Sequence, residues 1–241
     1  MTDNCSMLIQ AALNGGRSRA EHPAIPVTPE QLAASARECA AAGAGAVHFH
    51  VRDAAGKETI APNDVAAAVT AVRRAAPGTP CGVSIGLWIV SDPAERHATV
   101  AAWTTLPDFT TVNFREAGAI ALARHCLDRG LGVEVGVTEM AGAQAFIDSG
   151  LAPRCLRILM EPMDQDLAAA RASTAAIVAA LDRARITLPR MLHGLNATAW
   201  PIIDDALGRG YDTRVGFEDV LTLRDGRPAP GNGALVAEVR R

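Results

Sequence analysis

Two histidines separated by one residue, His48 and His50, are the side chains of this sequence whose types and spacing best allow chemistry. They lie in the segment from Gly45 to Asp53, whose alternating, β-prone residues predict a strand. Side chains two positions apart on a strand project from the same face, so both imidazoles converge on one place. Two converging nitrogen ligands suit a metal ion. The pair alone is equally compatible with two buried histidines that are satisfied by hydrogen bonds.

A second charged group lies near the other end of the sequence, where Arg214, Glu218 and Asp219 fall within the segment Thr213–Asp219. A carboxylate beside an arginine keeps a low pKa and stays ionised, so it can act as a metal ligand or a base. Acids are also favoured at helix N-termini by the helix dipole, and the segment alone leaves both interpretations open. Together with the histidine pair, it completes a set of two histidines and one glutamate, which is a recognised catalytic zinc set.

The elements that must position these side chains follow from an alternation of short apolar runs with alanine-rich segments. The apolar runs predict β-strands over Met7–Leu13, Ala46–Val51, Cys81–Leu87, Phe109–Phe114, Gly132–Val137, Cys155–Met160, Pro189–Gly194 and Asp212–Val215. Helices are expected to begin near Thr28, Pro62, Asp92, Glu116, Met140, Asp164 and Thr198, with a last helix over Gly233–Arg241. Thr28 and Asp92 each precede a proline, the pattern of an N-cap followed by proline at the first helical position.

Eight strands that alternate with helices over 241 residues predict an α/β fold, a (β/α)8 TIM barrel, as a single domain over residues 1–241. A doubly wound sheet would show a dinucleotide-binding motif after its first strand, and Asn14-Gly15-Gly16 is too short for one. TIM barrels build their active sites at the C-terminal ends of the strands. Polar residues predicted on or just after the strands are Asn14, His48, His50, Ser84, Thr111, Asn113, Glu134, Glu161, His193, Arg214, Glu218 and Asp219. Because polar side chains in apolar strands cost free energy unless they are paired or bind something, this set indicates a site.

The composition excludes several classes of protein. The net charge is −3 with no basic run, which argues against nucleic-acid binding. No apolar stretch is long enough to span a membrane and no signal-peptide pattern is present, so we expect a cytoplasmic protein. Five scattered cysteines argue against a disulfide framework: Cys5, Cys39, Cys81, Cys126 and Cys155. The single lysine, Lys57, lies in a polar stretch that predicts a loop, so Schiff-base chemistry is not expected.

Two blocks of the sequence carry a resemblance to a known family. The first combines Asn14-Gly15-Gly16, Thr28-Pro29-Glu30, Ala42-Gly43-Ala44 and the segment His48–Asp53, and the second is Thr213–Asp219. Both resemble the β-keto acid cleavage enzymes, which include the 3-keto-5-aminohexanoate cleavage enzyme. The resemblance implies a zinc-dependent TIM barrel that condenses a β-keto acid with acetyl-CoA, giving acetoacetate and a new acyl-CoA. It also implies a homo-oligomer, expected to be a tetramer.

Carried over by motif, the resemblance implies a role for each candidate site residue. His48, His50 and Glu218 look like the zinc ligands. Asp219 looks like the general base, held in a charged triad with Arg214 and Glu134. Residues that match substrate-binding positions are Asn14, Ser84, Thr111 and Asn113.

The sequence departs from the family pattern in places. Asn14 is neutral where the aminohexanoate enzyme has an acid, which argues against a cationic substrate, while Arg17 and Arg19 favour a neutral or anionic one. The loop Ser84–Leu87 has fewer glycines and threonines than the family pattern. Another metal-dependent carbon–carbon lyase, an aldolase, a hydrolase or a non-enzymatic metal-binding protein on the same barrel remains an alternative.

Overall fold

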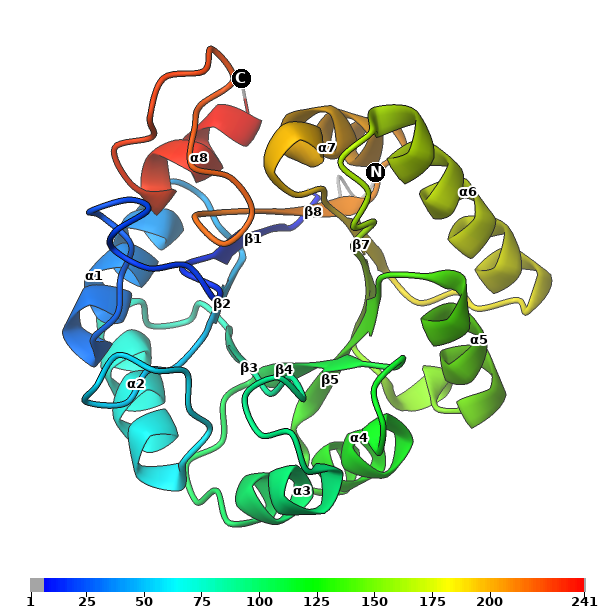
Figure 1. The fold of residues 1–241 in the computed structure, drawn as a ribbon, viewed down its shortest axis with the longest axis horizontal. Helices are drawn as coiled ribbons and strands as arrows, with labels where there is room; N and C mark the ends of the chain where they lie inside the picture. The colour runs from blue at the N-terminus through cyan, green and yellow to red at the C-terminus, as the bar shows by residue number, and fades with distance from the viewer. Residues whose placement is uncertain (1–6, 241) are drawn as a thin grey trace, which may run out of the picture.

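Parallel strands alternate with helices along the computed structural model, which describes residues 7–240. The strands are β1 (Ile9–Ala12), β2 (Ala46–Phe49), β3 (Cys81–Ser84), β4 (Phe109–Asn113), β5 (Gly132–Val137), β6 (Arg157–Met160), β7 (Arg190–Leu192) and β8 (Asp212–Val215). Each strand pairs in parallel with the next, and β8 pairs with β1, so the sheet closes into a barrel (Figure 1). The predicted TIM barrel is therefore confirmed.

The helices form a ring outside the strands, as the view along the barrel shows (Figure 1). They are α1 (Pro29–Ala41), α2 (Pro62–Ala75), α3 (Pro93–Ala101), α4 (Ala119–Asp128), α5 (Met140–Ser149), α6 (Leu167–Arg183), α7 (Ala199–Gly208) and α8 (Asn232–Val239). Short 3-10 helices cover Ala152–Arg154 and Asn196–Thr198. The predicted caps are confirmed, because Thr28 forms a capping box on α1 and Asp92 accepts two backbone N–H groups of α3.

Several element ends differ from the predicted ones. Helix α4 begins at Ala119 rather than near Glu116, because Gly118 precedes it in a left-handed conformation with φ of 74°. Helix α6 begins at Leu167 because Asp166, not Asp164, is its N-cap. Strand β3 ends at Ser84, whereas the predicted strand extended to Leu87. Ile85 is still buried after the strand ends, so the apolar run is longer than the strand itself. Helix α8 ends at Val239, and Arg241 lies outside the described residues, as does Cys5.

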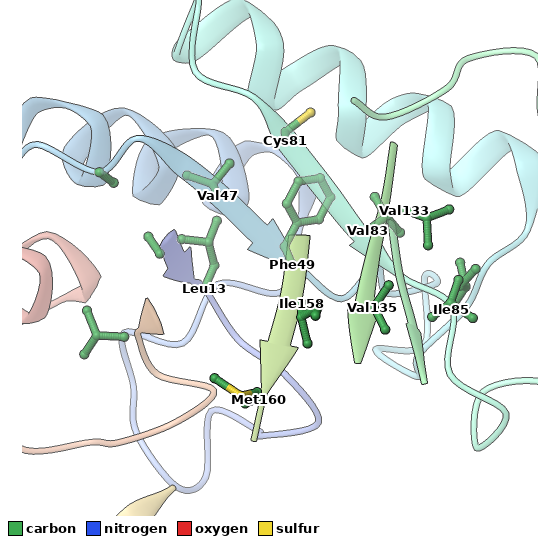
Figure 2. Close-up of a cluster of buried hydrophobic side chains, with 14 of the residues drawn as sticks. Leu13, Val47, Phe49, Cys81, Val83, Ile85, Val133, Val135, Ile158 and Met160 are labelled. Carbon is green, nitrogen blue, oxygen red and sulfur yellow. The ribbon is translucent and has the colours of Figure 1, made fainter. Parts of the chain in front are cut away.

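Alternation along the strands separates an apolar outer layer from a polar barrel interior. Val47 and Phe49 of β2 face the helices together with apolar residues of the neighbouring strands, and these side chains form one buried cluster (Figure 2). His48 lies between them in the sequence and therefore faces the interior. The same alternation turns Ser84 and Glu134 inward. The strand pattern thus delivers polar side chains to the space enclosed by the barrel.

The other expectations from composition concern cysteines and membrane spans. Cys39, Cys81, Cys126 and Cys155 are buried and free, and burial raises the pKa of the first three thiols to about 12. Such thiols are poor nucleophiles and behave as small apolar side chains. Within residues 7–240, no helix combines the length and the apolar character needed to cross a bilayer.

Candidate metal centre and active site

His48, His50 and Glu218 converge at the C-terminal end of the barrel. His48 lies on β2, His50 follows its last residue, and Glu218 follows β8; β1 separates the two strands. The Nε2 atom of His48 lies 3.8 Å from Oε2 of Glu218, and Nε2 of His50 lies 3.4 Å from Oε1. Gly15 lies where a Cβ atom would overlap the Glu218 side chain, so a glycine after β1 makes room for this carboxylate.

The donor atoms of this group suit a divalent cation. One ligand atom from each residue lies within 4.8 Å of the others. Burial lowers the pKa of His48 to about 4, which leaves a neutral imidazole. Burial opposes ionisation of Glu218, but Arg214 and both histidines outweigh it and hold its pKa well below the usual range. Oε2 of Glu218 is buried and has no hydrogen-bond partner among residues 7–240. An ionised carboxylate with a free oxygen opposite neutral imidazole nitrogen is the ligand chemistry of a zinc site.

Glu58 and Trp88 support His50 from the side away from Glu218. The Glu58 carboxylate bonds Nδ1 of His50 and also accepts a hydrogen bond of 3.3 Å from the Trp88 indole. The His50 and Trp88 rings stack, with their centroids 6.0 Å apart. Burial disfavours a charged His50, but Glu218 and Glu58 outweigh it and raise its pKa to about 9. A carboxylate on Nδ1 leaves Nε2 directed at the candidate metal position.

Arg214 organises the acids beside this centre. It donates to Asp219 through Nη2 and Nε at 2.6 and 3.2 Å, and to Glu218 at 3.1 Å. Glu161 lies 3.9 Å from Arg214, and His193 lies 3.5 Å from Asp219. Burial, with a contribution from Glu218, raises the pKa of Asp219 to about 7 although Arg214 opposes this. The low pKa predicted for a carboxylate beside arginine is therefore right for Glu218 and wrong for Asp219.

Among the described residues, Glu134 forms no hydrogen bond or ion pair with Arg214 or Asp219, so the structure does not bring it into the expected triad. Its carboxylate accepts hydrogen bonds from Gln10, Thr111 and Arg157, at 2.9, 2.8 and 2.6 Å. These partners come from β1, β4 and β6, so Glu134 braces the barrel interior from several sides. The third acid near Arg214 is Glu161, one of the polar residues expected at the strand ends.

A cavity of about 400 Å³ opens above the candidate metal ligands. Its wall includes Ser84 of β3 and Thr111 and Asn113 of β4, three of the residues that the family resemblance implies to bind substrate. Asn14 is not there. Its fully buried side chain donates to the carbonyl oxygens of Pro26 and His50 and accepts from the His50 N–H. Asn14 therefore fixes the backbone of a candidate ligand, and its side chain is committed to these bonds instead of lining the cavity.

Several polar residues lie outside the candidate metal centre. His97 and His125 contact each other across α3 and α4, with ring centroids 4.7 Å apart. Lys57 is exposed in a loop, as expected. Arg17 bonds Glu21 and the backbone of Glu218 instead of facing the cavity. Further residues line the cavity, and of these only Glu161 was among the polar residues predicted at the strand ends: Glu58, Trp88, Arg115, Glu161 and Met163. No periodicity marks loop residues, so only their charge in segments that follow strands could have drawn attention to them.

A closed parallel barrel with a candidate metal centre at the C-terminal ends of its strands is the architecture of a TIM-barrel enzyme. The chain belongs to the beta-keto acid cleavage enzyme family, whose sequence profile it matches over residues 6–241. It is similar to proteins named 3-keto-5-aminohexanoate cleavage enzyme from Fusobacterium nucleatum and Acetoanaerobium sticklandii. The identities are 26% and 25%, over 98% of this chain and 90% of each relative.

Solved structures support the fold. The ternary complex of ObcA with a C4-CoA adduct and oxalate matches 90% of this chain at 19% identity with a TM-score of 0.74. The binary complex of ObcA with oxaloacetate matches the same share at 18% identity with a TM-score of 0.73. In both cases the matched region spans 63% of the ObcA chain, so this chain corresponds to part of that longer protein.

Proposed function

We propose that this chain is a zinc-dependent enzyme that condenses a β-keto acid with acetyl-CoA and releases acetoacetate and a new acyl-CoA. The observation that carries the proposal is the convergence of His48, His50 and Glu218 beside the Arg214–Asp219 pair, in a member of the beta-keto acid cleavage enzyme family. Zinc bound by these ligands supplies Lewis-acid polarisation of the substrate carbonyl oxygens.

The proposed reaction exchanges one acyl group for another without oxidation or hydrolysis. A carboxylate removes a proton from the carbon between the keto and carboxyl groups. This carbon then bonds to the acetyl carbonyl carbon, and the CoA thiolate leaves. The thiolate attacks the original keto carbon, and the bond between that carbon and the carboxymethyl carbon breaks. The electron pair stays on the acetoacetate carbon, which regains the proton.

The residues of the site divide these tasks. Asp219 is the proposed general base, and its pKa near 7 suits proton transfer at neutral pH. Arg214 holds the Asp219 carboxylate by two hydrogen bonds and fixes its orientation. Ser84, Thr111 and Asn113 are proposed to bind the keto acid at the opposite wall. Asp219 is enclosed, whereas Glu161 reaches the cavity, so Glu161 is the carboxylate to compare with it.

The test combines metal analysis with turnover. Zinc-loaded protein is incubated with acetyl-CoA and a panel of charged, polar and aliphatic β-keto acids, and acetoacetate and acyl-CoA are quantified. His48→Ala should lose both metal and turnover. Asp219→Asn should keep the metal and lose roughly 10²- to 10⁴-fold in kcat, the usual contribution of a general base. If Glu161→Gln shows that loss and Asp219→Asn does not, the base is Glu161. Absence of acetoacetate across the whole panel would contradict the proposed function.

The proposed assembly rests on the family resemblance, and the proposed location and partners are the expectations drawn from the charge and hydropathy of the sequence. We propose a homo-oligomer, with a tetramer expected, in the cytoplasm, and no nucleic-acid or membrane partner. Light scattering of the purified protein measures the first of these directly, and a monomeric mass would contradict it.

A further inference from the structure

Arg115 places an exposed cation at the mouth of the candidate active site. It follows β4 two residues after Asn113 and lines the same cavity as Ser84 and Trp88. Within residues 7–240, no hydrogen bond or ion pair engages its guanidinium group. The other arginine of the cavity wall, Arg214, is 2% exposed and is held by Asp219 and Glu218. Arg115 is therefore the arginine of this wall that stays available for a ligand.

Arg115 lies across the barrel from His48, His50 and Glu218, and this position decides which part of a bound substrate it meets. In the closed order β1 to β8, strand β4 lies opposite β8, which leads to Glu218 (Figure 1). If the keto oxygen of a β-keto acid faces His48 and Glu218 and its chain crosses the cavity, groups further along the chain reach the β4 side. There the wall offers the uncharged donors Ser84 and Asn113 and then the guanidinium of Arg115.

The surroundings of Arg115 favour an anion carried by an anchored ligand. Glu139 and Asp164 line an adjoining hollow with Arg115, and neither pairs with it. These acids oppose the binding of a free anion from solvent. A carboxylate attached to a ligand already held in the cavity overcomes the repulsion by these two acids, because its local concentration near Arg115 is high. Arginine also binds carboxylates through two parallel hydrogen bonds, which gives the position selectivity for that group.

We propose that Arg115 binds a second carboxylate at the distal end of the substrate, so that the preferred β-keto acid is a dicarboxylic one. This inference rests on the proposed function and adds the substrate class to it. Like the expectation drawn from Arg17 and Arg19, it favours an anionic substrate, but it assigns the selectivity to Arg115. The phosphates of CoA present the same anionic chemistry, and the experiment must separate the two sources.

The experiment compares keto acids matched in length. β-Ketoadipate is paired with β-ketohexanoate, and β-ketopimelate with β-ketoheptanoate. For at least one pair, the diacid should have a kcat/KM at least about tenfold higher in the unaltered enzyme. Arg115→Gln should lower that value roughly 10- to 100-fold, the range for a hydrogen bond to a charged group. It should leave the monoacid and the KM for acetyl-CoA unchanged, and Arg115→Lys should retain part of the preference. Arg37→Gln, an exposed position on α1 outside the cavity, serves as the control.

Two results would overturn the inference. Equal kcat/KM values within both pairs would show that a distal carboxylate is not recognised. A rise in the KM for acetyl-CoA in Arg115→Gln, with the diacid preference intact, would assign the guanidinium to CoA phosphate instead. Calorimetric binding of the same acids without acetyl-CoA provides a readout that does not require turnover. Diacid preference in binding without cleavage would support the role of Arg115 and contradict the proposed function, so the two failures are distinguishable.

Discussion

The imidazole of His50 is held at both nitrogens, whereas that of His48 is not. Nδ1 of His50 bonds Glu58, and its Nε2 faces Glu218. Nδ1 of His48 is buried without a hydrogen-bond partner in the described structure. A carboxylate behind a histidine ligand fixes its tautomer and raises its basicity. His48 on β2 and His50 just after it should therefore differ in how strongly they are oriented toward a metal ion.

Glu58→Gln is expected to weaken zinc binding about 10- to 100-fold, the usual cost of removing a partner behind a ligand. The carboxamide keeps the shape of the side chain but removes the charge that stabilises the imidazole. Competition with a chromophoric chelator measures the affinity independently of turnover. Trp88→Phe is the matched variant, since it removes only the indole N–H donated to Glu58 and should change the affinity less. Unchanged affinity in Glu58→Gln would show that this carboxylate does not position His50.

Contact between β1 and β8 closes the barrel and brings the candidate ligands together. Gly216 follows β8, and a Cβ atom there would overlap the backbone of Ala12, including its carbonyl oxygen. Backbone atoms cannot move aside as the end of a flexible side chain can. The approach of these two elements therefore requires glycine, and Glu218 follows two residues later.

Gly216→Ala is expected to destabilise the fold by about 1–3 kcal/mol or more, the cost of overpacking a filled site. Urea unfolding followed by circular dichroism measures the change. Gly208→Ala is the matched control because a Cβ atom at this end of α7 meets nothing within 4 Å. In that helix alanine should be neutral or stabilising by up to about 1 kcal/mol. Equal stability of both variants would show that the contact between β1 and β8 relaxes more easily than the structure implies.

Asp108 joins β3, β4 and α2 at the start of β4. It accepts hydrogen bonds from the Cys81 N–H at 2.8 Å and from Arg73 at 2.6 Å. Burial opposes its ionisation, but these two donors outweigh burial and lower its pKa. A carboxyl whose pKa is lower in the folded state stabilises the fold above the unfolded pKa, near 4, and loses this contribution as pH falls through the folded pKa.

Asp108→Asn should therefore reduce the free energy of unfolding at pH 7 by roughly 0.5–1 kcal/mol, as for a half-exposed charged pair. The difference from the unaltered protein should shrink as the pH falls below about 4. Urea titrations at a series of pH values follow both trends. A difference that is constant across this range would mean that the charge of Asp108 does not contribute.

On the scale of the whole molecule, a bound metal should stabilise the barrel, because its ligands meet only in the folded chain. Zinc at 1,000 times its dissociation constant should add about 4 kcal/mol to the free energy of unfolding. Removal with a chelator should lower the melting temperature in a scanning calorimeter, and zinc should restore it. His48→Ala should melt at the same temperature with and without zinc. A similar zinc response in that variant would place the metal elsewhere.

The barrel and the centre of the site could be predicted from the sequence because both depend on local patterns. Period-two alternation around His48 marks a strand, and capping residues such as Thr28 mark the starts of helices. The partner of Glu134 could not be predicted, because Gln10 lies 124 residues away and meets it only across the closed barrel. Asn14 was assigned to substrate by motif, but its side chain turns to the backbone of His50. Loop residues such as Arg115 follow no periodicity.

The candidate ligands are drawn from strands close to the two ends of the chain. His48 and His50 are separated from Glu218 by most of the described chain, and the pairing of β8 with β1 brings them together. Such pairing of distant segments carries a large loop-closure cost and is expected late in folding. High-affinity zinc binding should thus appear only when the ring of strands is complete. Zinc binding would then report the completion of the barrel, and a zinc-sensitive dye in a refolding experiment could follow barrel closure directly.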